Sequence, residues 1–240
     1  MRMDLTKQTI LVVGGTSGFG REVAKQALAQ GATVHVLGQN QARLQAMLKD
    51  FSAAKLTGSV VDATDKQALT HFFANFKAYD HLVSTLGGAM AGGFMANSVD
   101  QVRQTIEAKF FTNLQLIKLA QPTIKANGSI TLTSGTGGHP ATASGAIIGN
   151  QAINTLVAGL AVELAPNIRV NAVAPTWTPT GLWRGLTPEA LAKQTQQAAA
   201  ATPLKRVATI AEVASAYLYL MQNQFITGQV LNVDGGVSVS

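Results

Sequence analysis

The sequence contains no cysteine and few charged residues. Without cysteine the chain has no disulfides, and its four histidines have neither thiolate partners nor the spacing of a metal site. Charged residues make up 12% of the 240 residues and hydrophobic ones 47%, so much apolar surface should be buried, part of it between subunits. We therefore expect no bound metal and a homo-oligomer.

Basic residues outnumber acidic ones, but they do not cluster. Eighteen Lys and Arg against twelve Asp and Glu give a net charge of +6, with Lys205 and Arg206 as the only adjacent pair. This scatter argues against a nucleic-acid partner and indicates a mild attraction for anionic ligands. No apolar run approaches the ~18 residues of a membrane span, and the first eight residues do not resemble a signal peptide. A cytoplasmic protein without a membrane partner is expected.

Strand-like and helix-like runs alternate along the chain. Parallel strands need crossover helices, and strands buried on both faces lose polar alternation. The order therefore predicts an α/β fold: a Rossmann-type, doubly wound, seven-stranded parallel sheet flanked by helices, in a single domain over residues 1–240. The expected strands are 9–13, 33–37, 56–61, 81–86, 129–133, 169–174 and 230–233. The expected helices are 20–30, 41–50, 66–76, 99–125 and 143–164, with a last helix around Tyr217.

Residues 176–206 interrupt this alternation. Segments of that length without a regular place in a compact domain are usually functional. We interpret 176–206 as a substrate lid rather than a surface insertion. Its side chains, with two from the segment after the fourth strand, predict a largely apolar substrate pocket. These side chains are Phe94, Met95, Trp177, Leu182 and Trp183.

A glycine-rich turn follows the first strand. Gly14, Gly18 and Gly20 come directly after the apolar run ILVV and lead into a helix. Residues without a Cβ allow a tight turn and a close approach of the backbone to phosphate, and the free amides at the helix start favour an anion. The strand, turn and helix together predict a site for the pyrophosphate of a dinucleotide.

The spacing of this turn resembles the TGxxxGxG motif of short-chain dehydrogenases/reductases, with Val13 where threonine is usual. VVDATD, ELAPNIRVNAVAPTWTPT and TGQVLNVDGG are similar to other segments of that family, so the resemblance covers nearly the whole chain. It implies a bound NAD(P) and, by analogy with helices that pack between subunits in similar proteins, a homodimer or homotetramer. The cofactor-binding residues that the turn and the resemblance imply are Gly14, Thr16, Ser17, Gly18, Phe19, Gly20, Gln39, Asn40, Asp62, Gly87, Asn150, Pro175 and Thr180.

The end of the second strand bears on which cofactor is bound. A carboxylate there would repel the extra phosphate of NADP, but Gly38 occupies the usual acidic position. The arginine frequent in NADP-preferring relatives is replaced by Gln39, which leaves neutral donors and Arg43 to hold the phosphate. We predict NADP, with NAD as the alternative.

The resemblance does not extend to the family's catalytic residues. Its tyrosine and the lysine four residues later correspond to Ala146 and Asn150. The chain has only three tyrosines, and none is predicted on the active-site face. Lys109 stands at the helix asparagine of the family's tetrad, and Ser134 near its serine. We take Lys109, with Ser134 or His139, as the catalytic candidates.

Three functions are consistent with these residues. The first is an NADP(H)-dependent oxidoreductase of a small carbonyl or alcohol substrate with a non-standard proton donor. The second is a nucleotide-binding sensor or scaffold without dehydrogenase turnover, which the loss of the usual catalytic residues favours. The third is a different reaction on the same fold, such as an isomerisation or dehydration, because fold alone does not define chemistry.

Overall fold

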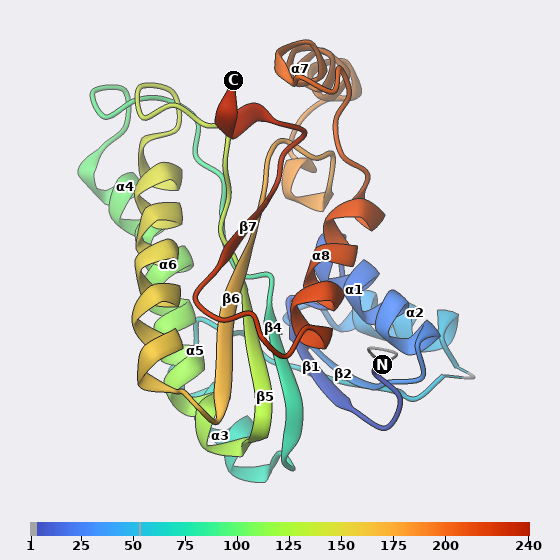
Figure 1. The fold of residues 1–240 in the computed structure, drawn as a ribbon. Helices are drawn as coiled ribbons and strands as arrows, with labels where there is room; N and C mark the ends of the chain where they lie inside the picture. The colour runs from blue at the N-terminus through green and yellow to red at the C-terminus, as the bar shows by residue number, and fades with distance from the viewer. Residues whose placement is uncertain (1–3, 53) are drawn as a thin grey trace.

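The computed structural model describes residues 4–52 and 54–240, which build one sheet covered on both faces (Figure 1). All seven strands are parallel, in the order β3-β2-β1-β4-β5-β6-β7. The strand order reverses between β1 and β4, and ligands of open α/β sheets bind outside the carboxyl ends of the strands at such a point. The strands are β1 (Thr9–Val13), β2 (Thr33–Gly38), β3 (Leu56–Val60), β4 (Tyr79–Ser84), β5 (Ile124–Thr133), β6 (Ile168–Pro175) and β7 (Val230–Val233).

Helices cover the sheet as two layers (Figure 1). On one side α1, α2 and α8 pack over a cluster that includes Val12 and Tyr217, and on the other α3, α5 and α6 pack over one that includes Leu82 and Ile153. Both clusters consist of buried apolar side chains, as expected for central parallel strands. The helices are α1 (Gly18–Ala29), α2 (Gln41–Asp50), α3 (Lys66–Asn75), α4 (Val99–Ile106), α5 (Thr112–Ala120), α6 (Ser144–Glu163), α7 (Pro188–Ala201) and α8 (Ile210–Gln222).

The fold class and the seven-stranded parallel sheet are confirmed, whereas several element boundaries are corrected. The expected continuous helix over 99–125 is three pieces: α4, a π-helical turn (Glu107–Phe111) and α5. It ends before Pro122, whose ring has no amide hydrogen to donate, and a single 3₁₀ turn (Gln121–Thr123) leads into β5. The fourth strand runs over Tyr79–Ser84, two residues earlier than expected.

Helix α6 bears on the expectation that no apolar run approaches the length of a membrane span. With 20 residues and a mean hydropathy of 1.4 over its most apolar window, it is long and apolar enough to cross a membrane by length and composition alone. Its buried side chains Ile153, Val157 and Ala161 pack against the sheet. Core helices of α/β proteins commonly meet that criterion, so this helix is weak evidence for a membrane.

The expected lid, 176–206, contains a 3₁₀ turn (Gly181–Trp183) and helix α7. Thr187 caps α7 by accepting a hydrogen bond from the Ala190 amide, and Pro188 occupies its first position. No residue of α7 is fully buried. Figure 1 shows α7 beyond the carboxyl ends of the strands, apart from the two helical layers.

Candidate functional site

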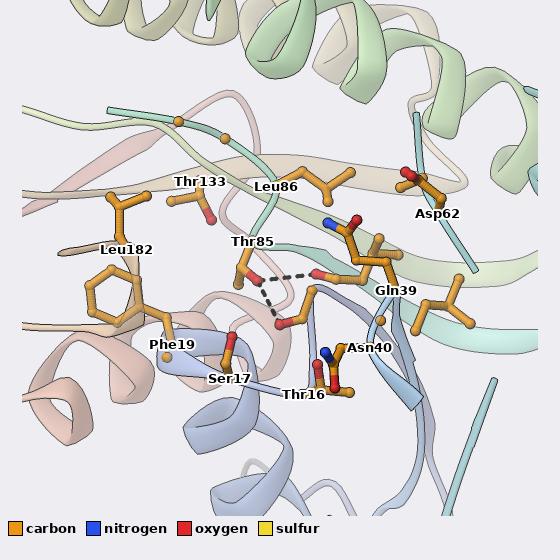
Figure 2. A pocket seen from close by; sticks show the side chains of 18 of the residues that line it. Thr16, Ser17, Phe19, Gln39, Asn40, Asp62, Thr85, Leu86, Thr133 and Leu182 are labelled. Atoms are coloured by element: carbon orange, nitrogen blue, oxygen red, sulfur yellow. Dashed lines mark hydrogen bonds between the residues drawn. The ribbon is translucent and has the colours of Figure 1, made fainter. Parts of the chain in front are cut away.

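A cavity of about 320 Å³ lies at the carboxyl ends of β1, β2, β4 and β5, where the strand order reverses. Its walls come from the glycine turn, the ends of β2 and β4, the π-helical turn and the first part of the 176–206 segment. Figure 2 shows Thr16 and Asn40 together on one side, and Leu182 close to Phe19 on another. Ten of the thirteen expected cofactor residues line this cavity: Gly14, Thr16, Ser17, Gly18, Phe19, Gln39, Asn40, Asp62, Gly87 and Thr180.

The glycine turn has the geometry that a phosphate needs. Gly14 and Gly18 adopt positive φ angles of 78° and 52°, which residues with side chains rarely adopt. A Cβ on Gly20 would come within 2.5 Å of the Gly14 carbonyl oxygen, so only glycine lets α1 begin this close to the turn. Among the described residues, the Gly18 and Phe19 amides have no backbone acceptor. These two donors and the open turn fit an oxyanion.

Thr85 holds the end of β4 against this turn. Its hydroxyl donates to the Val13 and Gly14 carbonyl oxygens at 3.1 and 3.3 Å, as the dashed lines in Figure 2 show. Its backbone amide also donates to the Val13 oxygen at 3.0 Å. The turn is therefore fixed from two strands, which preorganises it for a ligand.

At the end of β2, Gly38 is packed under Thr16. A Cβ on Gly38 would lie 2.6 Å from the Thr16 hydroxyl oxygen, so a carboxylate side chain does not fit there without displacing Thr16. Asn40 accepts a hydrogen bond from the Arg43 amide at 2.9 Å and so caps α2. This end of the cavity therefore presents side-chain amides and a guanidinium instead of a carboxylate.

Three cations line the cavity, namely Arg43, Lys109 and Arg184. Within the described part of the chain, none has an ion pair, and no side-chain hydrogen bond is found for any of them. Asp62 is the one acid among the described lining residues, and one of its carboxylate oxygens accepts two hydrogen bonds from Thr64. The cavity therefore carries a positive excess suited to a phosphate-rich ligand.

Lys109 lies on the π-helical turn and is only 6% exposed. Its side chain passes across Gly149 of α6, where a Cβ would be 2.9 Å from Cδ, and its Nζ lies 3.5 Å from the Cβ position of Gly87. Burial without a counter-ion lowers the pKa of Lys109 to about 8. π-Helical turns are often found at functional sites. This one places an amine whose pKa lies close to neutral pH in the cavity wall.

The other two catalytic candidates do not line this cavity with Lys109. Ser134 is buried, and its hydroxyl donates to the Asn154 side-chain oxygen at 2.6 Å. His139 is exposed in the loop before α6, where its Nδ1 accepts from the Ala141 amide at 3.1 Å. The structure therefore leaves Lys109 as the candidate with direct access to the cavity.

Three expected cofactor residues also lie outside the cavity lining: Gly20, Asn150 and Pro175. Pro175 is buried at the end of β6, where its carbonyl oxygen accepts from the Thr136 amide. The Asn150 side chain fills the space beside Gly135, and its Oδ1 is buried with no partner in the described chain. Gly20 acts through the packing of the turn described above.

The expected apolar pocket is not assembled as predicted. Of its five side chains only Leu182 lines the cavity. Trp183 stacks on Trp177 with ring centroids 4.1 Å apart, and Met95 is almost fully exposed. Sequence spacing could not show this, because these residues lie on irregular segments whose side-chain directions follow no period.

Sequence reasoning missed two groups at the site. Arg184 lines the cavity, and nothing in its immediate sequence distinguishes it from the other scattered cations. Tyr217 was placed away from the active-site face, yet its hydroxyl is 2.7 Å from that of Thr133, which lines the cavity. Tyr217 is itself fully buried, and burial raises its pKa well above the usual value, so it supports Thr133 but is a poor acid.

Comparisons with known proteins agree with this geometry. A family model described as enoyl-(acyl carrier protein) reductase matches residues 13–238. A tropinone reductase homologue from Arabidopsis thaliana is 34% identical over all of this chain and 95% of its own length. The structure of a small-chain dehydrogenase in complex with NADPH superimposes with a TM-score of 0.83 at 32% identity, over 98% of this chain and all of the other. Ligand-free aldohexose dehydrogenase from Thermoplasma acidophilum has a TM-score of 0.85 at 26% identity, over 98% and 96%.

Proposed function

Because the chain belongs to the short-chain dehydrogenase/reductase family, we propose that it is an NADP(H)-dependent oxidoreductase of small carbonyl or alcohol substrates in which Lys109 is the proton donor. The observation that carries the proposal is the unpaired, buried Lys109 ammonium in the same cavity as the glycine turn. A cation without a counter-ion is destabilising where it lies, so its position calls for a functional reason.

The residues present fit a dinucleotide. The Gly18 and Phe19 amides would hold the pyrophosphate, and Asp62 the adenine. Arg43, Gln39 and the α2 N-terminus would hold the additional phosphate of NADP. When bound, the reduced cofactor supplies a hydride to the carbonyl carbon of the substrate.

Lys109 completes the reduction at the other atom of the carbonyl group. As hydride reaches the carbon, the ammonium of Lys109 gives one proton to the oxygen, so the carbonyl becomes an alcohol and the amine becomes neutral. A proton from solvent restores the ammonium. An amine with a pKa of about 8 is protonated at neutral pH and still acidic enough to give up its proton. In the oxidation direction the neutral amine accepts the proton.

Fluorescence titration with NADPH and NADH tests cofactor binding, and a screen of small aldehydes, ketones and quinones tests turnover. We expect NADPH to bind more tightly than NADH. The Arg43→Ala variant should lose affinity for NADPH and leave that for NADH unchanged, with the exposed Lys49→Ala on the same helix as the control. Equal loss for both cofactors would contradict the assignment of Arg43 to the additional phosphate.

A nucleotide-binding sensor or scaffold is the second candidate. It is favoured by Ser134, whose hydroxyl already bonds Asn154, and by Ala146, which has no proton to donate. Tight NADPH binding without oxidation by any carbonyl in the screen would support this candidate over the first.

A different surface supports our expectation of a homo-oligomer. Large apolar side chains are exposed on α4, the π-helical turn and α6, at Val99, Phe111 and Val162. Exposed apolar groups on neighbouring helices are typical of contacts between subunits. We expect a homodimer or homotetramer through this face, and Phe111→Glu with Val162→Glu should reduce the mass measured by light scattering. An unchanged mass would place the interface elsewhere.

A further inference from the structure

Arg184 lies where the 176–206 segment first meets the cavity. It directly follows the 3₁₀ turn (Gly181–Trp183), and its side chain folds back over that turn. Arg184 Nη2 lies 2.8 Å from the Cβ position of Gly181, so the guanidinium packs against the first residue of the turn. Arg184 is therefore an exposed cation that also lines the cavity.

The surroundings of this turn belong to the phosphate end of the cavity. The Thr180 Cβ is 3.7 Å from the Cβ position of Gly18, the first residue of α1. Leu182, two residues later, lies close to Phe19 (Figure 2). The Gly18 and Phe19 amides are the backbone donors without an acceptor described above. The lid and the start of α1 therefore face the same part of the cavity.

No protein group in the described chain neutralises Arg184. It has no ion pair and no side-chain hydrogen bond there, and Asp62, the one acid of the described lining, lies after β3. Glu189, the nearest acid along the lid sequence, is hydrogen-bonded to Thr187 and to its own backbone. A guanidinium offers five donors in a planar fork that matches phosphate oxygens.

We propose that Arg184 is a phosphate-binding residue carried by the lid, which binds an oxyanion of the dinucleotide from the side opposite the α1 amides. This inference rests on the proposed function, because it requires a dinucleotide in the cavity. It adds a consequence: the ligand joins the lid to the glycine turn, so cofactor binding orders the lid. Helix α7 itself has no fully buried residue, so few packing contacts oppose a change in its position.

The first test is NADPH affinity, measured by fluorescence titration of the full-length protein. We expect Arg184→Ala to weaken binding by at least about tenfold at low salt, and Arg184→Lys by less, because a point charge replaces a fork. The salt dependence of binding should also be shallower in Arg184→Ala. Lys193→Ala, an exposed cation on α7, is the matched control and should bind as the wild type does.

The second test uses trypsin, which cleaves after exposed arginine and lysine. Both Arg184 and Lys193 are exposed in the lid. Saturating NADPH should slow cleavage after Arg184 by about tenfold or more and cleavage after Lys193 by less. Equal protection at the two bonds would contradict a direct contact of the ligand with Arg184.

The outcomes separate this inference from the proposed function. Wild-type binding of NADPH with an unchanged affinity in Arg184→Ala overturns the role of Arg184 and leaves the proposed function intact. Failure of the wild type to bind either NADPH or NADH overturns both. Benzoate is a probe for a substrate carboxylate in the same trypsin assay, read at the bond after Lys193. If Arg184→Ala binds NADPH normally, and benzoate protects this bond in the wild type but not in the variant, then Arg184 binds a substrate carboxylate and the phosphate assignment is wrong.

Discussion

Arg169 and Lys109 are both cations largely removed from bulk water, but their side chains differ in their hydrogen-bond partners. Arg169 on β6 donates to three carbonyl oxygens at the end of α8 and just beyond it, those of Leu220, Met221 and Ile226, at 2.8–3.0 Å. The Lys109 ammonium has no hydrogen-bond or ionic partner in the described chain, although the Lys109 carbonyl oxygen accepts from Asn113 Nδ2. Burial lowers the pKa of both.

This difference distinguishes a structural cation from a functional candidate. The donors of Arg169 satisfy carbonyl groups that the end of a helix leaves unpaired, so its charge is used within the fold. The charge of Lys109 satisfies no group within the described fold. It faces the cavity that the glycine turn also lines. We therefore expect a substitution of Lys109 to lower turnover and a substitution of Arg169 to lower the free energy of unfolding.

The largest effect should be on turnover. Lys109→Met removes the proton donor, and we expect kcat to fall by about 10²- to 10³-fold with an NADPH affinity within a few-fold of the wild type. The assay is NADPH oxidation with the best carbonyl substrate of the screen, and Lys118→Met on the exposed side of α5 is the control. Unchanged turnover would remove Lys109 from the mechanism.

The next effect concerns stability at the other cation. Arg169→Met leaves three carbonyl oxygens without their donor, so the free energy of unfolding should fall by about 3 kcal/mol. Urea denaturation measures it. Arg103→Met, which breaks an exposed ion pair with Asp100, should change it by less than about 0.5 kcal/mol. Similar losses for the two variants would mean that the Arg169 hydrogen bonds contribute little.

Lys109→Met should raise the free energy of unfolding, the opposite of the effect of Arg169→Met, because it removes an unpaired buried charge. The folded protein releases the Lys109 proton near pH 8 and the unfolded chain near 10.4, so between these values the unfolded state binds more protons and stability rises with pH. We expect the variant to be more stable at pH 7 by on the order of 2 kcal/mol, and the difference to shrink toward pH 10. A destabilised variant at pH 7 would show that the ammonium has a partner in solution.

The smallest effect is expected at His81, whose pKa is lowered to about 4 by burial and by the neighbouring Arg169 charge. The neutral ring is hydrogen-bonded to Ser129 and Gln8. Between pH 6.5 and 4 the unfolded chain binds the proton first, so acid should destabilise the protein, by about 1 to 2 kcal/mol at pH 5. Thermal unfolding of His81→Gln should show less of this dependence, and the exposed His71→Gln should retain it.

Ten of the thirteen expected cofactor residues line the cavity, but only one of the three expected catalytic residues does. Gly14, Gly18 and the residues around Gln39 follow directly after strands, and a strand followed by a glycine turn has few possible geometries. Lys109 was found because its helical position could be counted from Pro122. The sequence did not show that Ser134 and His139 lie outside the cavity that Lys109 lines. Their orientation depends on Asn154 and on a loop conformation that no local pattern encodes.

By itself, the sequence determined the parallel sheet and the glycine turn. It also predicts that Ala146 and Asn150 stand where the family usually carries its tyrosine and lysine. These follow from local periodicity, backbone freedom and residue identity, which need no knowledge of distant contacts. Only the tertiary structure decided that the Lys109 ammonium is buried without a partner in the described chain, that Arg184 packs against Gly181, and that Arg169 donates to three carbonyl oxygens at and beyond the end of α8. The reason is physical: the charge state and accessibility of a side chain depend on groups distant in sequence, which packing alone brings together.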